Sequence, residues 1–218
     1  VWGDRIFLST AIPAAKAAEP DAPQAREEPP PPPPAPERRG RRGRRGVGGP
    51  PGASPDVQQK HRFVLLCLDR ETGKTLWEQT VVEETPHEGH HQDHGFASHS
   101  PVTDGSHVYV SFGSRGLHCY DFDGNRRWSK QFGKMRTRNA FGEGSSPLLT
   151  GDTIVVNWDH EGDDFIVALD KTDGSEKWRR ERDEPTTWAT PVAAPGEGGT
   201  QVIVNGTNRI RSYDLATG

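Results

Sequence analysis

Five of the nine histidines lie in one short stretch, residues 83–99. Neutral imidazole is a good ligand for zinc, copper or nickel, and His90, His91 and His94 lie beside Asp93, so this stretch carries enough donors for one ion. The spacing matches neither a zinc finger nor histidines on successive helical turns. Two interpretations stay open: a metal site with His90, His91 and His94 as ligands, or a polar loop whose histidines hydrogen-bond to neighbouring elements.

Residues 157–164 form a second chemically unusual stretch, which is strongly acidic. Carboxylates at flexible spacing suit calcium, but the order and the terminal glutamate of an EF-hand loop are absent. A third stretch, residues 183–189, contains Trp188, whose flat ring could stack on a ligand or cap a core.

Residues 134–145 add Arg138 and Glu143. Arg138 with Glu143, and His94 with Asp93, are candidate acid/base pairs for a hydrolase or lyase, or salt bridges that fix the loops. No catalytic residue can be assigned from these patterns. The side chains expected to form one ligand-binding site are His94, His99, Arg138, Glu143, Asn157, Asp159, His160, Thr187 and Trp188.

A repeated segment must position these loops. An Asp-x-x-Thr-Gly type of turn followed by tryptophan recurs, and Trp77, Trp128 and Trp178 lie 51 and 50 residues apart. A fixed period of this length is typical of repeat architectures. The turn glycine supplies the positive φ of a tight hairpin, and the regular recurrence of tryptophan predicts packing between neighbouring units.

A second hairpin precedes each of the later turns, and it begins at a Ser/Thr-Pro pair: Ser100-Pro101, Ser146-Pro147 and Thr190-Pro191. Two hairpins give four strands per unit, which is the pattern of a β-propeller blade. Because the strands alternate in direction, the Asp-Gly turns should lie on one face. The polar stretches described above should then gather on the other face, at the mouth of a central channel.

These repeats resemble those of pyrroloquinoline quinone (PQQ)-type propellers, over residues 1–12 and 61–218. That family includes quinoprotein dehydrogenases and non-enzymatic propellers of the outer-membrane assembly lipoprotein kind. The resemblance implies PQQ and calcium as cofactors to consider, and a periplasmic, cell-envelope or secreted location. The chain departs from the quinoprotein pattern, because it has no Cys-Cys pair and no matching set of acidic and amide side chains.

We therefore predict an all-β fold, a β-propeller fragment with about four four-stranded antiparallel blades of a seven- or eight-bladed ring. The first strand of the first blade and the last strand of the fourth are expected to be absent. The expected boundaries are a partial first blade at 1–12 and 61–82, a Pro/Arg-rich insert without order at 13–60, a second blade at 83–131, a third at 132–181 and a truncated fourth at 182–218.

The insert contains six consecutive prolines at 29–34 and six arginines between 38 and 45. The formal net charge is −4, so the remainder of the chain carries about −10, which argues against a propeller that binds nucleic acid, apart from the arginine tract. No apolar run is long enough to span a membrane. Cys67 and Cys119 are expected to be buried thiols rather than a disulfide.

The function that these features favour is a non-catalytic binding or scaffold module, which recognises a protein, peptide or glycan at its channel mouth. The alternative is a PQQ-dependent dehydrogenase, and a hydrolase or lyase that uses His94 and Arg138 is a third hypothesis.

Overall fold

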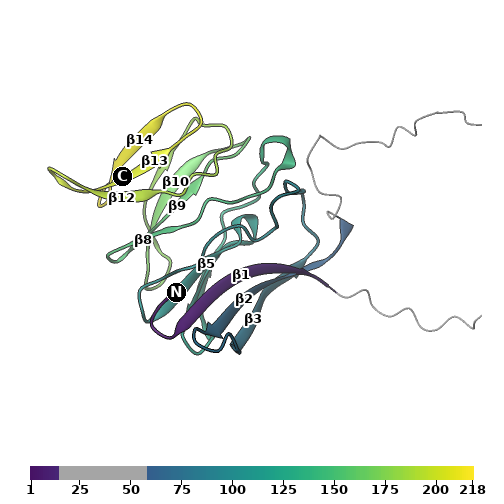
Figure 1. Cartoon of the computed structure of the whole chain (residues 1–218). Helices are drawn as coiled ribbons and strands as arrows, with labels where there is room; N and C mark the ends of the chain where they lie inside the picture. The colour runs from purple at the N-terminus through teal and green to yellow at the C-terminus, as the bar shows by residue number, and fades with distance from the viewer. Residues whose placement is uncertain (15–57) are drawn as a thin grey trace, which may run out of the picture.

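The computed structural model describes residues 1–14 and 58–218. Four antiparallel sheets follow one another along the chain (Figure 1). The strands are β1 (Arg5–Pro13), β2 (His61–Asp69) and β3 (Thr75–Glu84) in the first sheet; β4 (Val102–Thr103), β5 (His107–Ser111), β6 (Leu117–Asp121) and β7 (Arg126–Lys130) in the second; β8 (Leu148–Thr150), β9 (Thr153–Trp158), β10 (Phe165–Asp170) and β11 (Glu176–Glu181) in the third; and β12 (Val192–Gly196), β13 (Gly199–Asn205) and β14 (Ile210–Asp214) in the fourth. Short 3-10 turns occur at Gly113–Arg115 (η2) and Arg138–Ala140 (η3).

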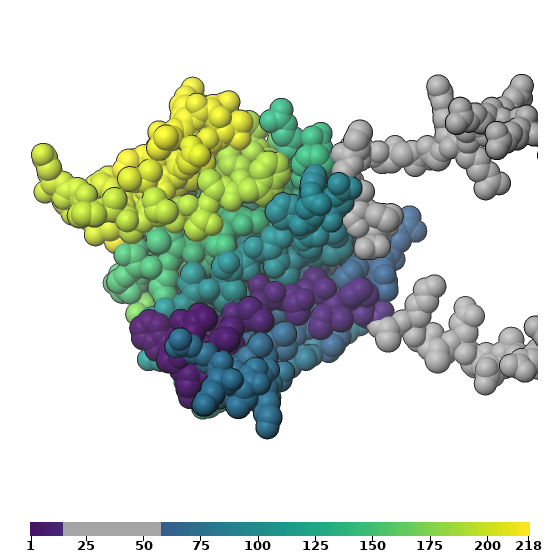
Figure 2. All heavy atoms as spheres, viewed as in Figure 1, coloured from purple at the N-terminus to yellow at the C-terminus, as the bar shows by residue number. Residues whose placement is uncertain are grey.

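The predicted all-β architecture is confirmed. The second and third sheets have four strands each, and the first and fourth have three each. Colours run in bands from purple and blue to yellow in the space-filling view, so each sheet packs on the next in chain order (Figure 2).

The predicted insert lies outside the described residues from 15 to 57. At its two ends Pro13 pairs with His61, and the amide of Ala14 donates to the carbonyl of Lys60 at 2.7 Å. Strand β1 therefore continues one residue beyond the expected boundary.

Each repeat tryptophan joins its sheet to the next, as predicted. The indole N–H donates to the carbonyl of the residue that follows the hairpin aspartate one sheet further on. The three bonds are Trp77 to Phe122 at 2.8 Å, Trp128 to Lys171 at 3.0 Å and Trp178 to Leu215 at 2.8 Å.

The turn glycine serves the same contact. Gly174 has φ +74°, and a methyl group at this position would lie 2.8 Å from the ring of Trp128. Gly124 and Gly218 have φ +84° and face Trp77 and Trp178 in the same way. The turn therefore needs glycine both for its left-handed backbone and for the space that the preceding tryptophan fills.

A second set of bonds links the sheets through the Ser/Thr-Pro pairs. The amide of Ser100 donates to Oγ of Ser146 at 2.9 Å, and the amide of Ser146 donates to Oγ1 of Thr190 at 3.2 Å. The hydroxyls of Ser146 and Thr190 thus each accept a backbone bond from the equivalent residue one sheet earlier.

Apolar clusters fill the space between successive sheets, and both cysteines belong to them. Cys67 lies with Phe63 and Leu65, and Cys119 lies with Tyr109. Both thiols are free and buried, as predicted. Burial raises the pKa of each thiol, that of Cys119 to about 12.

Candidate functional site

The antiparallel order gives the molecule two distinct faces. The turns after β4, β6, β8 and β10 lie on one face. The connections after β3, β5, β7, β9 and β11 lie on the other, which we call the loop face. The four unusual stretches of the sequence, residues 83–99, 134–145, 157–164 and 183–189, all reach the loop face.

An open cleft of about 470 Å³ lies on this face. Three separate stretches form it: the histidine-rich stretch, the segment before β8 and the segment before β12. Its lining consists of His91, His94, Ser98, Phe141, Gly142, Glu143, Gly144 and Trp188. We refer to it as the aromatic cleft.

One wall of the aromatic cleft is a row of rings. The His91 and Phe141 rings meet edge to face with centroids 4.9 Å apart, and the His91 and His94 rings are 5.8 Å apart. The amide of His91 also donates to the carbonyl of Phe141 at 2.9 Å. Backbone and side-chain contacts therefore tie the two stretches together.

Trp188 supplies another wall and is 43% exposed. Its indole N–H donates to the carbonyl of Gly142 at 2.7 Å, which fixes the ring against residues 142–144. A methyl group on Gly144 would lie 3.4 Å from this ring. The same loop contains two non-glycine residues with positive φ, Asn139 at +57° and Ala140 at +54°. Such strain concentrates at functional sites.

Glu143 lies at the floor of the cleft and is nine-tenths buried. Its carboxylate accepts the amide of Ser114 at 2.6 Å and the hydroxyl of Ser114 at 2.5 Å, and Nη1 of Arg115 lies 3.7 Å away. Burial raises the pKa of Glu143, and Arg115 and Ser114 oppose that rise. The suggested pair of Glu143 with Arg138 is wrong, because Ser114 and Arg115 take the carboxylate instead.

Arg115 is also buried, and it organises the interior below the cleft. Its Nε donates to Glu84 at 2.8 Å, and its guanidinium lies 4.6 Å from the ring centroid of Phe63. His99 is 3% exposed, and burial together with the nearby Arg115 charge lowers the pKa of His99 to about 4. A ring held in this way does not line the cleft.

The three candidate metal ligands of the histidine-rich stretch are not brought together as a ligand set. Nδ1 of His90 donates to the carbonyl of His91 at 2.7 Å, and Nδ1 of His91 accepts the amide of Asp93 at 3.2 Å. The second suggested acid/base pair is wrong too, since Asp93 lies 3.5 Å from His91 rather than beside His94.

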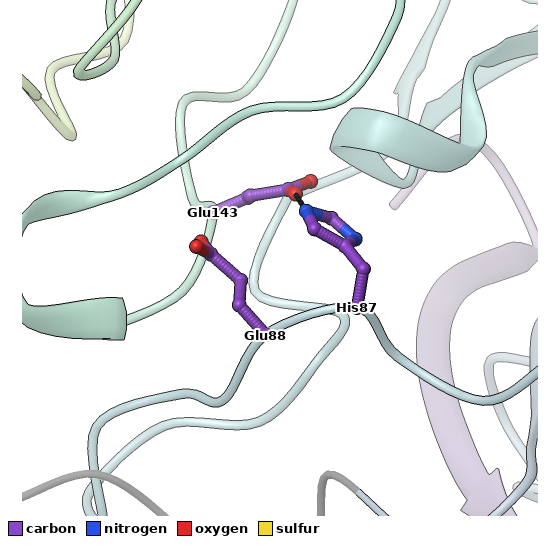
Figure 3. A group of neighbouring side chains, drawn as sticks. All are labelled: His87, Glu88 and Glu143. Atoms are coloured by element: carbon purple, nitrogen blue, oxygen red, sulfur yellow. Dashed lines mark ion pairs between the residues drawn. The ribbon is translucent and has the colours of Figure 1, made fainter. Parts of the chain in front are cut away.

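Among the described residues, one group brings three possible metal-ligand atoms within 4.8 Å of one another: His87, Glu88 and Glu143 (Figure 3). Nε2 of His87 donates to the carbonyl of Met135 at 2.8 Å. Glu88 accepts the amide and hydroxyl of Thr137, at 3.0 Å and 2.6 Å. All three donors are thus engaged in holding loops together, which does not favour a bound ion.

Asn157, Asp159 and Thr187 lie together, but inside the protein. Asp159 forms a two-pronged ion pair with Arg182, at 2.6 Å and 3.0 Å, and both side chains have 0% exposure. Asn157 and Thr187 donate to the same carboxylate at 3.0 Å and 2.9 Å. Arg182 also donates to the hydroxyl of Tyr213 at 2.5 Å.

Three carboxylates of the acidic stretch are engaged in contacts within the protein. Asp159 neutralises Arg182, and Glu161 accepts the amide and hydroxyl of Thr186. Asp164 accepts the amides of His160 and Glu184. These carboxylates bind the protein's own donors and do not converge on an ion.

Two more of the expected site residues lie away from the aromatic cleft. His160 lines a second cavity of about 630 Å³, and its Nδ1 accepts the amide of Arg136 at 3.2 Å. The backbone amide of Arg138 donates to Thr186 at 2.9 Å, and the residue is exposed. The nine expected residues thus divide, with His94, Glu143 and Trp188 in the cleft.

Sequence reasoning missed Phe141 and Arg182. Phe141 is the only aromatic residue in the stretch 134–145, and this could have indicated a place for it in the binding site. Arg182 gave none, since a lone arginine after a strand resembles any exposed charge.

Comparison with known proteins shows which family the chain belongs to. A family model described as outer membrane protein assembly factor BamB matches residues 61–218. The chain belongs to this family. A Yersinia pestis protein named outer membrane protein assembly factor BamB is 26% identical over 146 residues, which make up 66% of this chain and 34% of that protein.

Two solved structures are similar to the chain. BamB from Moraxella catarrhalis has a TM-score of 0.49 and 18% identity, over 71% of this chain and 41% of that one. A quinohemoprotein alcohol dehydrogenase from Pseudomonas putida HK5 has a TM-score of 0.45 and 14% identity, over 73% and 31%. The chain spans about a third of the Yersinia protein's length. Over the described residues, no helix combines the length and the hydropathy needed to cross a bilayer.

Proposed function

We propose that this chain is a recognition module that binds a protein partner through the aromatic cleft. The observation that carries the proposal is the cleft itself, in which rings from three separate stretches converge on a rigid set of sheets. Concave sites with apolar walls and a few polar groups are the usual ligand sites of proteins. The name of the matched family, an outer membrane protein assembly factor, supports a protein partner and a location in the periplasm or cell envelope.

The contacts of two buried carboxylates favour binding over catalysis. Glu143 is held by Ser114 and Arg115, and Asp159 by Arg182. These contacts hold the two carboxylates in place and stabilise the loops. The exposed rings are then the surface that the cleft offers to a ligand. The Phe141 and Trp188 rings recognise and position ligands but carry no group that transfers a proton in hydrolysis.

Site-specific photo-crosslinking tests the proposal. A photoreactive amino acid replaces Ser98, an exposed residue of the cleft, in the intact protein in cells. The matched control replaces Asp123, an exposed residue in the β6–β7 turn on the opposite face. We expect adducts with another protein from position 98 and none from position 123. Equal labelling from both positions, or adducts with glycans alone, would contradict a protein-binding cleft.

The described residues favour binding over the alternative function, that of a quinone enzyme. Trp188 offers a flat ring, but the acidic side chains that could hold calcium are paired inside the protein with Arg182 and backbone amides. Adding PQQ and calcium to the intact protein should therefore give no cofactor absorbance and no dye-coupled oxidation of alcohols. Activity that disappears in Trp188→Ala would reverse this choice.

A further inference from the structure

We propose that the aromatic cleft binds a proline-rich sequence, and that its occupant is the run of six prolines at 29–34 in the chain's own insert. This inference rests on the proposed function, since it assigns a ligand class to the same cleft: a protein partner would have to displace the tethered prolines of the chain's own insert.

The chemistry of the cleft walls is the first step. Grooves lined by aromatic rings recognise proline runs, because prolyl rings pack on ring faces and a polyproline II helix needs little ordering. Trp188, Phe141 and His91 supply three such rings. The single polar atom of the Trp188 ring is already bonded to Gly142, so an occupant of this wall meets an apolar ring.

The position of the insert is the second step. Strand β2 begins at His61, whose ring packs on Phe96 with centroids 4.9 Å apart, and the Phe96 ring packs on His90 at 4.4 Å. His90 in turn abuts Gly142, where an added methyl group would lie 3.0 Å from Cβ of His90. A continuous row of contacts thus connects the root of the insert with the floor of the aromatic cleft.

The length of the insert is the third step. Fourteen residues separate Ala14 from the first proline of the run. A flexible linker of this length has an average span of roughly 20 Å, and an extended one reaches roughly 45 Å. A tethered ligand within reach has an effective concentration in the millimolar range, so even a weak contact is well populated.

The test uses a variant in which serine replaces each of the six prolines, Pro29→Ser through Pro34→Ser. A synthetic peptide with the sequence of residues 26–37 is titrated into this variant and into the intact protein, and calorimetry measures binding. We expect the peptide to bind the serine variant and to bind the intact protein at least tenfold more weakly, because the tethered prolines compete. Adding Trp188→Ala to the serine variant should abolish binding, while thermal unfolding verifies that the fold is kept. No binding to the serine variant at about 1 mM peptide, or equal binding after Trp188→Ala, would overturn the inference.

Photo-crosslinking from position 98 separates this inference from the proposed function. An adduct with residues 29–34 of the same chain, identified by mass spectrometry and lost in the serine variant, supports the inference. Adducts with another protein only, at the same yield in both backgrounds, overturn it and leave the proposed function intact. No adduct in either background overturns both.

Discussion

Protonation of His99 is expected to destabilise the folded protein in mild acid. The ring is 3% exposed, and its Nδ1 has no hydrogen-bond partner among the described residues. Burial is the larger cause of its low pKa, and the positive charge of Arg115 is the second. Both oppose a proton on the folded ring, whereas the ring of the unfolded chain accepts one freely.

The size of the effect follows from the two pKa values. The pKa of His99 is 6.5 in the unfolded reference and about 4 in the folded chain. Between these values the unfolded state binds more protons, so the free energy of unfolding falls as the pH falls. Linkage then gives a loss of about 2 kcal/mol between pH 7 and pH 5, and of about 3 kcal/mol by pH 4.

Urea unfolding of the intact protein and of His99→Gln over this pH range measures the effect. Glutamine does not titrate, so the difference in unfolding free energy between the two proteins should shrink by about 2 kcal/mol from pH 7 to pH 5. The exposed His94→Gln is the matched control, and its curve should run parallel to that of the unaltered protein. A difference between His99→Gln and the unaltered protein that stays constant within about 0.5 kcal/mol would refute the reasoning, since a ring that keeps its solution pKa cannot be buried beside a cation.

Two further predictions concern a turn glycine and a buried ion pair. Gly73→Ala should lower the free energy of unfolding by about 1 kcal/mol, because Gly73 has φ +69° but open space around it. Gly174→Ala should lower it by about 2–4 kcal/mol, because the added methyl group also meets Trp128. Equal losses in urea unfolding would show that the contact with Trp128 does not contribute. Asp159→Asn should cost about 3–5 kcal/mol, since it leaves the buried charge of Arg182 without a counter-charge, and a loss below about 1 kcal/mol would place that pair in solvent.

The repeat made most of the fold predictable. A fixed spacing of turn and tryptophan carries information about three dimensions, because both residues belong to one contact that each sheet makes with the next. The bond from Trp128 to Lys171 and the fit of Gly174 against that ring are the physical reason for the spacing. The Ser/Thr-Pro pairs carried the same kind of signal, although the bond from Ser100 to Ser146 became visible only in the structure.

The site was less predictable, because which polar residue faces the cleft depends on partners that no repeat specifies. Asp159 and Glu143 are residue types that often bind ligands, yet here their carboxylates accept hydrogen bonds from Arg182 and Ser114. These partners lie 23 and 29 residues away in sequence, on other connections. Trp188 was predictable, since a large ring that departs from the repeat has no packing role to perform in it.

Burial divides the loop face into two kinds of residue, and that division holds for any longer protein that contains this chain. Additional sheets or partners can cover surface but cannot uncover it, so His99 and Asp159 remain interior groups whatever surrounds them. Trp188 is different, because 43% of its surface is open while its indole N–H is already satisfied by Gly142. Covering it buries apolar area without stranding a polar atom, which is favourable in water. The Trp188 ring is therefore a surface that gains from being covered, and prolines such as those at 29–34 have the chemistry to cover it.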